Sequence, residues 1–188
     1  PEEHKPEFHP LQKKLFADGR AWVFAKNLEI IIPSSIEETI KRKLTFLNPE
    51  MKIFLEMIAV FGQEIIVDII AMASKRNVGE TLHAFDELRR LGFIKERTGE
   101  NYFFGEDIVR QVVYKNIPRA DLIEYHKSVG ETIEYFYRST MANYYEQLAR
   151  HFTIAKDEQK ALFYSKKAAL KAHNNYAHNL AIDFYENA

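Results

Sequence analysis

The chain contains no cysteine in its 188 residues, and glycine and proline are scarce, with 7 and 6 copies. The absence of cysteine excludes a disulfide, a thiolate zinc site and a thiol nucleophile. Because glycine and proline disfavour helix interiors, their scarcity among 28% charged residues favours helices joined by short loops. A basic surplus is also missing: 26 basic and 27 acidic residues leave a net charge of −1, whereas nucleic-acid-binding domains are usually basic.

Long apolar runs are absent as well. The longest nearly apolar stretches, at 28–33, 57–62 and 65–73, fall far short of the ~20 residues that span a bilayer. The acidic, proline-broken start PEEHKPEFHP lacks the pattern of a signal peptide. We therefore expect a cytoplasmic protein with no membrane partner. Since the sequence starts without Met and stops within a helical pattern, we also expect it to be an excised fragment.

Motifs that carry chemistry are missing too. The sequence has no G-x-x-x-x-G-K-[ST], G-x-G-x-x-G, H-E-x-x-H or G-x-S-x-G pattern, and therefore no phosphate-binding loop of its own. We expect no catalytic residue, no metal site and no cofactor within these residues. The histidines are scattered, and His126 and His151 lie beside apolar residues on expected helices, which favours a packing role over metal binding.

The first part of the sequence contains a series of helical patterns, after which the spacing of apolar residues becomes strand-like. Two β-prone runs, GRAWVF and LEIII, predict a hairpin or two edge strands within 1–33, at the end of a preceding domain. Four helices are expected next: one after Pro33, one from Asn48 to Gly62, and two at 67–73 and 78–91. The last has an apolar stripe of Val78, Leu82, Phe85, Leu88 and Leu91. Strand-like runs at 93–96 and 101–104 then predict a hairpin with Gly99 in its turn.

The second part of the sequence returns to helical spacing. Helices are expected at 106–117, 119–138, 143–155, 158–173 and 177–188. Alanines in this region follow the 8, 20, 27 spacing of a tetratricopeptide-type helix pair, and its echo begins 20 residues later instead of about 34. The residues assigned to this packing signature are Leu148, Ala149, Phe152, Ala161, Ala168, Ala181, Tyr185 and Ala188. We interpret the segment as a divergent helical repeat that is cut off.

Three helices followed by a two-stranded hairpin is the order of elements in a winged helix, whose third helix can enter a DNA groove. The cations that would then contact DNA are Arg90, Lys95 and Arg97. The same helix also presents Glu80, Asp86 and Glu87, and carboxylates repel phosphates. We therefore keep DNA binding as the alternative and prefer a packing or protein-interaction role.

Aromatic residues are concentrated in the run YFYRSTMANYY, which contains Tyr135, Phe136, Tyr137, Tyr144 and Tyr145. One interpretation is an interface between the last helix of one unit and the first helix of the repeat. The other is a partly exposed surface that binds a partner. The first is favoured, because helices that meet must bury their apolar faces.

Four segments carry a resemblance to a known family. They are IPSSIEETIKRKLTFLNPEMKIFLEMIAVFGQEI, LHAFDELRRLGFIKER, YFFGEDIVRQVVYKNIPRADLIEYHKSVGETIE and YYEQLARHFTIAKDEQKALFYSKKAALKAHNNYAHNLAIDFYENA. From about Trp22 onward, the chain resembles the region after the nucleotide-binding domain of STAND-type signal-transduction ATPases, which are AAA+-related. The resemblance implies a winged helix that packs on that upstream domain, followed by repeats that sense a ligand or partner. ATP or ADP is then expected on the upstream domain and not here.

The resemblance also points to two residues after the hairpin. Many relatives have a histidine there, in an F-x-H-x-L-I-R-E pattern, and in some STAND proteins a winged-helix histidine contacts the nucleotide. The matching stretch here is FGEDIVRQ, so Glu106 occupies the histidine position and Arg110 is retained. Because a carboxylate repels phosphate, we do not expect Glu106 to bind the nucleotide, and we favour an ion pair for Arg110.

Together these patterns predict a mainly α protein in which a winged-helix domain with a small β-hairpin wing precedes tetratricopeptide-like repeats. The predicted divisions are a lead-in at 1–33, the winged-helix-like domain at 34–138 and the start of the repeats at 139–188. The expected function is non-catalytic: regulation and protein interaction within a larger STAND-like ATPase. Its expected partners are other proteins or the parent's own nucleotide-binding domain.

Overall fold

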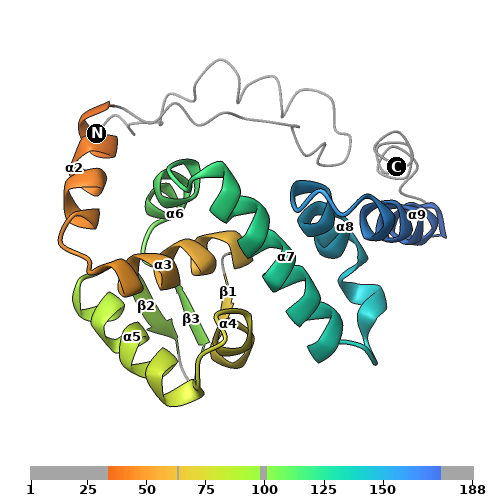
Figure 1. The fold of residues 1–188 in the computed structure, drawn as a ribbon, viewed down its shortest axis with the longest axis horizontal. Helices are drawn as coiled ribbons and strands as arrows, with labels where there is room; N and C mark the ends of the chain where they lie inside the picture. The colour runs from red at the N-terminus through yellow and green to blue at the C-terminus, as the bar shows by residue number, and fades with distance from the viewer. Residues whose placement is uncertain (1–33, 63, 98–100, 175–188) are drawn as a thin grey trace, which may run out of the picture. The chain divides into compact units, whose positions relative to one another are not determined.

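The computed structural model describes residues 34–62, 64–97 and 101–174, drawn in colour in Figure 1. The chain divides into two units, Pro1–Ile31 and Ile32–Ala188, and all described residues belong to the second. The hairpin expected within 1–33, the turn at Gly99 and the helix expected at 177–188 lie outside the described residues.

The described part of the chain is mainly helical, as predicted, and contains one small antiparallel sheet. The elements are α2 (Ser34–Leu44), α3 (Pro49–Phe61), β1 (Glu64–Ile66), α4 (Val67–Ala73), α5 (Val78–Arg90), β2 (Ile94–Arg97), β3 (Asn101–Phe104), α6 (Asp107–Lys115), α7 (Arg119–Phe136), a 3-10 turn (Met141–Asn143), α8 (Tyr145–Ile154) and α9 (Glu158–Asn174). Strand β1 was not predicted, because three residues are too few to show a period.

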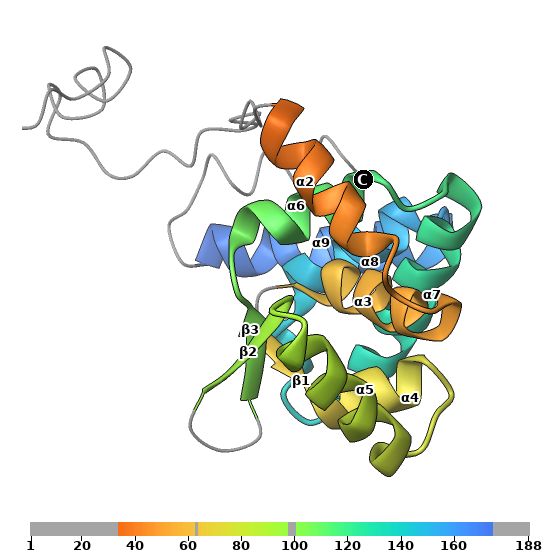
Figure 2. The ribbon, with the colours of Figure 1, turned by 90° about the vertical axis from the view of Figure 1, so that its left-hand side faces the viewer.

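The sheet has the strand order β1-β3-β2, so the hairpin β2–β3 gains a third strand from the segment between α3 and α4. Ile65 of β1 pairs with Tyr102, and Ile94 of β2 pairs with Phe104; all four side chains are buried. On α5, Phe85 packs edge-on against Tyr102, with 4.9 Å between ring centroids. Figure 2 shows the sheet next to α5.

The exposed side of α5 differs from the sequence prediction. Of the predicted stripe, only Phe85 and Leu88 are buried, whereas Val78, Leu82 and Leu91 are 45%, 37% and 40% exposed. The small residues Thr81 and Ala84 take the inward positions instead. The hydrophobic pattern of the sequence does not predict this buried face, because Thr81 and Ala84 are only weakly apolar. Their small side chains let α5 approach its neighbours closely.

One continuous core joins the first helices to the last pair. The cluster of buried residues runs from Phe54 and Ile58 on α3, through Ile133 on α7, to Phe152 on α8 and Tyr164 on α9. In Figure 1, α8 and α9 lie at the right-hand end, beyond α7. The boundary predicted between 138 and 139 therefore falls inside a single compact unit, and its status as a domain boundary stays a prediction.

Two contacts fix the last helix pair on α7. A Cβ atom added to Gly130 would lie 3.1 Å from Cζ of Phe152, so the missing side chain allows α8 to approach closely. On the neighbouring turn, Glu134 accepts hydrogen bonds from the Lys160 ammonium and the Tyr164 hydroxyl of α9, each at 2.6 Å. The α8–α9 pair is thus held by both shape and charge-assisted hydrogen bonds.

Candidate functional site

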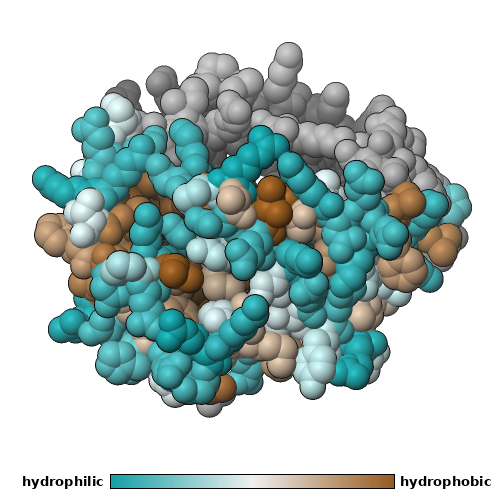
Figure 3. All heavy atoms as spheres, in the orientation of Figure 1, coloured by the Kyte–Doolittle hydropathy of each residue, from teal (hydrophilic) through white to brown (hydrophobic). Residues whose placement is uncertain are grey.

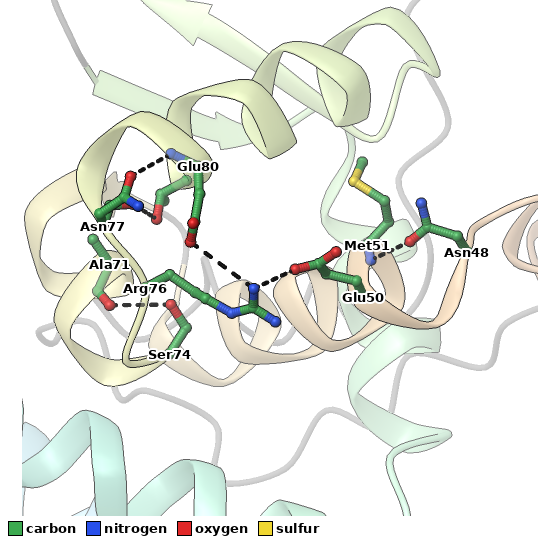
Figure 4. Close-up of polar contacts among 9 residues, drawn as sticks. Asn48, Glu50, Met51, Ala71, Ser74, Arg76, Asn77 and Glu80 are labelled. Atoms are coloured by element: carbon green, nitrogen blue, oxygen red, sulfur yellow. Dashed lines mark hydrogen bonds and ion pairs between the residues drawn. The ribbon is translucent and has the colours of Figure 1, made fainter.

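The N-terminus of α5, which would face DNA in a winged-helix reader, is closed by local contacts (Figure 4). The Asn77 side chain accepts a hydrogen bond from the Glu80 amide at 2.8 Å and so caps the helix. Arg76 lies between two carboxylates, 2.6 Å from Glu50 of α3 and 3.9 Å from Glu80. The guanidinium that precedes this helix is therefore already paired with carboxylates, which reduces the positive field available to a phosphate.

The remaining cations of α5 are paired in the same way. Arg89 bonds Asp86 at 3.0 Å and also pairs with Glu96 of β2, and Arg90 lies 3.4 Å from Glu87. Of the three residues proposed for DNA contact, Arg90 is thus in an ion pair and Lys95 lies beside a hollow at the base of the hairpin. For Arg97, the last residue of β2, the structure describes the backbone and not the side chain.

Glu106 and Arg110, the positions marked by the family resemblance, lie at the start of α6. Glu106 is the exposed N-cap residue and makes no capping hydrogen bond with its side chain. It borders a hollow of about 390 Å³ between α2 and the base of the hairpin, to which Lys43 and Lys95 also contribute. Arg110 does not enter this hollow; its Nε donates to Asp107 at 3.0 Å, an ion pair within one helical turn.

The described residues of the predicted repeat signature lie on α8 and α9. Leu148, Ala149, Phe152 and Ala168 are buried, and Ala161 is partly buried and packs against the core. The Phe152 and Tyr164 rings stack at 5.6 Å and join the two helices. Ala181, Tyr185 and Ala188 lie outside the described residues. The assignment of these helices to a helical repeat stays a prediction.

A buried histidine pair connects α6, α7 and α8. Nδ1 of His126 lies 2.9 Å from Nδ1 of His151, and Nε2 of His126 lies 2.9 Å from the Tyr114 hydroxyl. Both histidines are 0% exposed, and Nε2 of His151 has no hydrogen-bond partner. The partnerless nitrogen is less costly as an acceptor than as an N–H donor, so we assign His151 as the Nδ1–H tautomer donating to His126.

The histidine pair stays neutral because of where it lies. Burial lowers the pKa of His126 to about 3, and the guanidinium of Arg150 acts in the same direction. Burial, the neighbouring His126 and Arg150 hold the pKa of His151 well below its ordinary value. The packing role expected for both residues agrees with this position. The partner Tyr114 left no signal in the sequence, because it meets His126 only when α6 folds against α7.

A second titratable group is buried in a hollow of about 540 Å³ between α2, α3 and α6. Burial raises the pKa of the Glu56 carboxyl, whose contacts to the Tyr125 hydroxyl and the Lys52 ammonium are long, 3.4 Å and 3.7 Å. Burial and the nearby Glu56 raise the pKa of Tyr125 to about 12. These groups stabilise each other only weakly, because both contacts of the carboxyl are long.

The face of the molecule in Figure 3 is mostly hydrophilic, and its apolar residues lie in several patches, one of them at the right-hand end, over α9. The large apolar side chains of α9 that are more than a third exposed are Leu162, Phe163 and Leu170. Among the described residues, no group of three or more His, Cys, Asp or Glu side chains can hold a metal ion. No helix in the described ranges is long and apolar enough to cross a membrane.

Comparison with protein-family models, with curated proteins and with solved structures gave no match for this chain.

Proposed function

We propose that the chain is a non-catalytic regulatory and protein-interaction part of a larger STAND-like signalling ATPase. In this role it couples a nucleotide-binding domain to helical repeats that sense a ligand or partner. The observation that carries the proposal is the continuous core, which links the helix–hairpin unit α3–β3 to the α8–α9 pair through α7. A contiguous packed core of this kind can carry a change from one end to the other.

The first half of the chain supports this reading through its topology. The order α3, β1, α4, α5, β2, β3, with the sheet order β1-β3-β2, is the arrangement we expect of a winged helix. The cations of α5 are paired with carboxylates, which disfavours DNA and leaves the surface free to pack on another protein domain. In the proposed role, the nucleotide domain is the partner that this half contacts.

The second half supports the reading through its packing. Ala149 on α8 and Ala168 on α9 are buried, as the small residues of stacked helical repeats are. On its other side α9 exposes Leu162, Phe163 and Leu170. An exposed apolar face on a repeat helix suits a further element of the array or a partner, because each repeat buries its core only against neighbours.

The coupling role is tested in the longer protein by breaking the clamp between α7 and α9. Glu134→Ala removes both hydrogen bonds to α9, whereas Glu131→Ala changes an exposed carboxylate on the same helix and serves as the matched control. We expect Glu134→Ala to change the rate of ATP hydrolysis or nucleotide exchange several-fold and Glu131→Ala to leave it unchanged. Equal rates in both variants would contradict coupling through α7.

The non-catalytic role is tested on the chain itself. Purified residues 1–188 should release no phosphate from ATP above the buffer rate, since the sequence has no phosphate-binding loop. Hydrolysis that persists through repeated purification would refute the proposal. The gene sequence upstream of Pro1 gives an independent check, because the proposal requires a Walker A and B pair there.

A further inference from the structure

A third hollow, of about 610 Å³, lies where the end of α3, strand β1, the α7–α8 connection and α8 meet. Its volume falls in the range of small-molecule sites. The side chains that give it chemical character are Tyr137, Asn143, Tyr144, Gln147 and Arg150. None of them belongs to the positions marked by the resemblance or to the repeat signature, so the proposed function has not used this hollow.

One wall of the hollow is aromatic. Tyr137 and Tyr144 stack with 3.9 Å between ring centroids and 18° between ring planes, and each is only partly buried. Both tyrosines belong to the aromatic run YFYRSTMANYY, which connects α7 to α8. Both also line the hollow. A planar ring can extend such a stack or meet it edge-on.

The opposite character comes from Arg150 on α8. Among the described residues, its guanidinium makes no ion pair and no hydrogen bond, unlike Arg110, which pairs with Asp107. Although Arg150 is exposed at the surface, desolvation by the surrounding protein, and then the nearby Arg110, lower its pKa. Arginine nevertheless stays charged in proteins, so the Arg150 guanidinium is a cation without a carboxylate partner among the described residues.

Other polar groups complete the setting. Asn143 and Gln147 line the hollow, and Gln147 donates a long hydrogen bond of 3.4 Å to the Phe61 carbonyl, so both amides can reorient toward a ligand. Glu146 also borders the hollow, one turn before Arg150 on α8, but no ion pair joins the two in the structure. The Glu146 carboxylate repels anions, so the hollow should bind them less tightly than Arg150 alone would.

We propose that this hollow binds a small ligand that combines a planar ring with an anionic group, either a phosphate or a carboxylate. The ring packs against Tyr137 and Tyr144, and the anion pairs with the free guanidinium of Arg150. This proposal names the class of ligand that the repeat region would sense. The sensing role rests on the proposed function, whereas the binding itself does not.

The experiment is a titration of the isotope-labelled chain, followed by amide NMR shifts, with three probes. Phenyl phosphate carries ring and anion, inorganic phosphate carries the anion alone, and benzamidine carries a ring with a cation. We expect phenyl phosphate to shift amides around 137–150 with a Kd of about 1–10 mM, as suits a fragment of its size. Inorganic phosphate should bind about tenfold more weakly, and benzamidine should not bind.

Variants separate the site from general surface binding. Arg150→Gln should weaken phenyl phosphate binding about tenfold or more, because it removes a charged hydrogen-bond partner. Glu146→Gln should strengthen it a few-fold. Arg138→Gln is the matched control: Arg138 lies 4.5 Å from the Tyr135 ring, outside the hollow, and its loss should leave the Kd unchanged. The unliganded spectrum of each variant shows whether it is folded.

The absence of any amide shift with phenyl phosphate up to about 50 mM, well above the expected Kd, would overturn the proposal. Amide shifts of equal size with benzamidine would also overturn it. So would an unchanged Kd for phenyl phosphate in folded Arg150→Gln. The proposed function fails separately. If phenyl phosphate binds this chain through Arg150 but leaves ATP turnover by the longer protein unchanged, the sensing role is refuted and the site stands.

Discussion

Mild acid should destabilise this chain through the buried pair His126–His151. Both histidines have a lower pKa in the folded state than in the unfolded one, where the ordinary value of about 6.5 applies. The unfolded chain therefore binds protons that the folded chain does not, and the free energy of unfolding falls as the pH drops below about 6.5. The fall continues toward the folded pKa of His126, about 3.

The magnitude follows from the same values. One pKa unit corresponds to about 1.4 kcal/mol. A histidine that is neutral in the folded chain and protonated in the unfolded chain at pH 5 therefore lowers the free energy of unfolding by about 2 kcal/mol relative to pH 7.5. The two together lower it by about 4 kcal/mol. For a domain of this size, that loss lowers Tm by about 10 °C. It is a large share of the 5–15 kcal/mol that holds a typical domain folded.

The assay compares thermal unfolding by circular dichroism at pH 7.5, 6.0 and 5.0. The test variant is His126→Leu/His151→Leu, which removes both titrating groups and keeps apolar volume in the core. The half-buried Tyr114 hydroxyl can then bond water. His83→Asn, which changes an exposed histidine on α5, is the control and should keep the wild-type pH dependence. Because the wild type and the double variant share every titrating group except the histidine pair, the difference between their pH profiles isolates that pair.

The expected result is a wild-type Tm that falls more steeply with acid than that of the double variant, by about 10 °C at pH 5.0. Parallel profiles for the two proteins would refute the reasoning. Should the double variant not fold at pH 7.5, His151→Leu alone removes the nitrogen without a partner and about half of the effect.

Three further predictions concern packing, capping and DNA. Gly130→Ala should lower the free energy of unfolding in urea by about 1–3 kcal/mol, since the new methyl group meets Phe152 at 3.1 Å; an unchanged midpoint would show that α8 shifts freely. Asn77→Ala should cost about 1 kcal/mol in the same assay, because the Glu80 amide loses its cap, whereas Asn77→Asp should cost less. Duplex DNA should not change its gel mobility with the chain at about 50 mM salt, and a salt-dependent shift lost on Lys95→Ala would restore the DNA interpretation.

Local signals in the sequence determined most of the secondary structure. Asn48 followed by Pro49 marked the start of α3, Gly62 marked its end with φ 137°, and the strand at 101–104 lies where the change of period predicted it. Such features act within a few residues, because a cap, a helix-breaking residue or an alternation is decided by the backbone next to it. The absence of a phosphate-binding loop was equally visible in the sequence.

Contacts between distant residues were decided only by the tertiary structure. Strand β1 forms because Ile65 pairs with Tyr102 of β3. Helix α5 buries its small residues Thr81 and Ala84 because they fit the space that the neighbouring elements leave. The hollow beside Arg150 forms only when the end of α3 meets the α7–α8 connection. No spacing along the chain encodes these meetings, since each depends on how several helices pack at once.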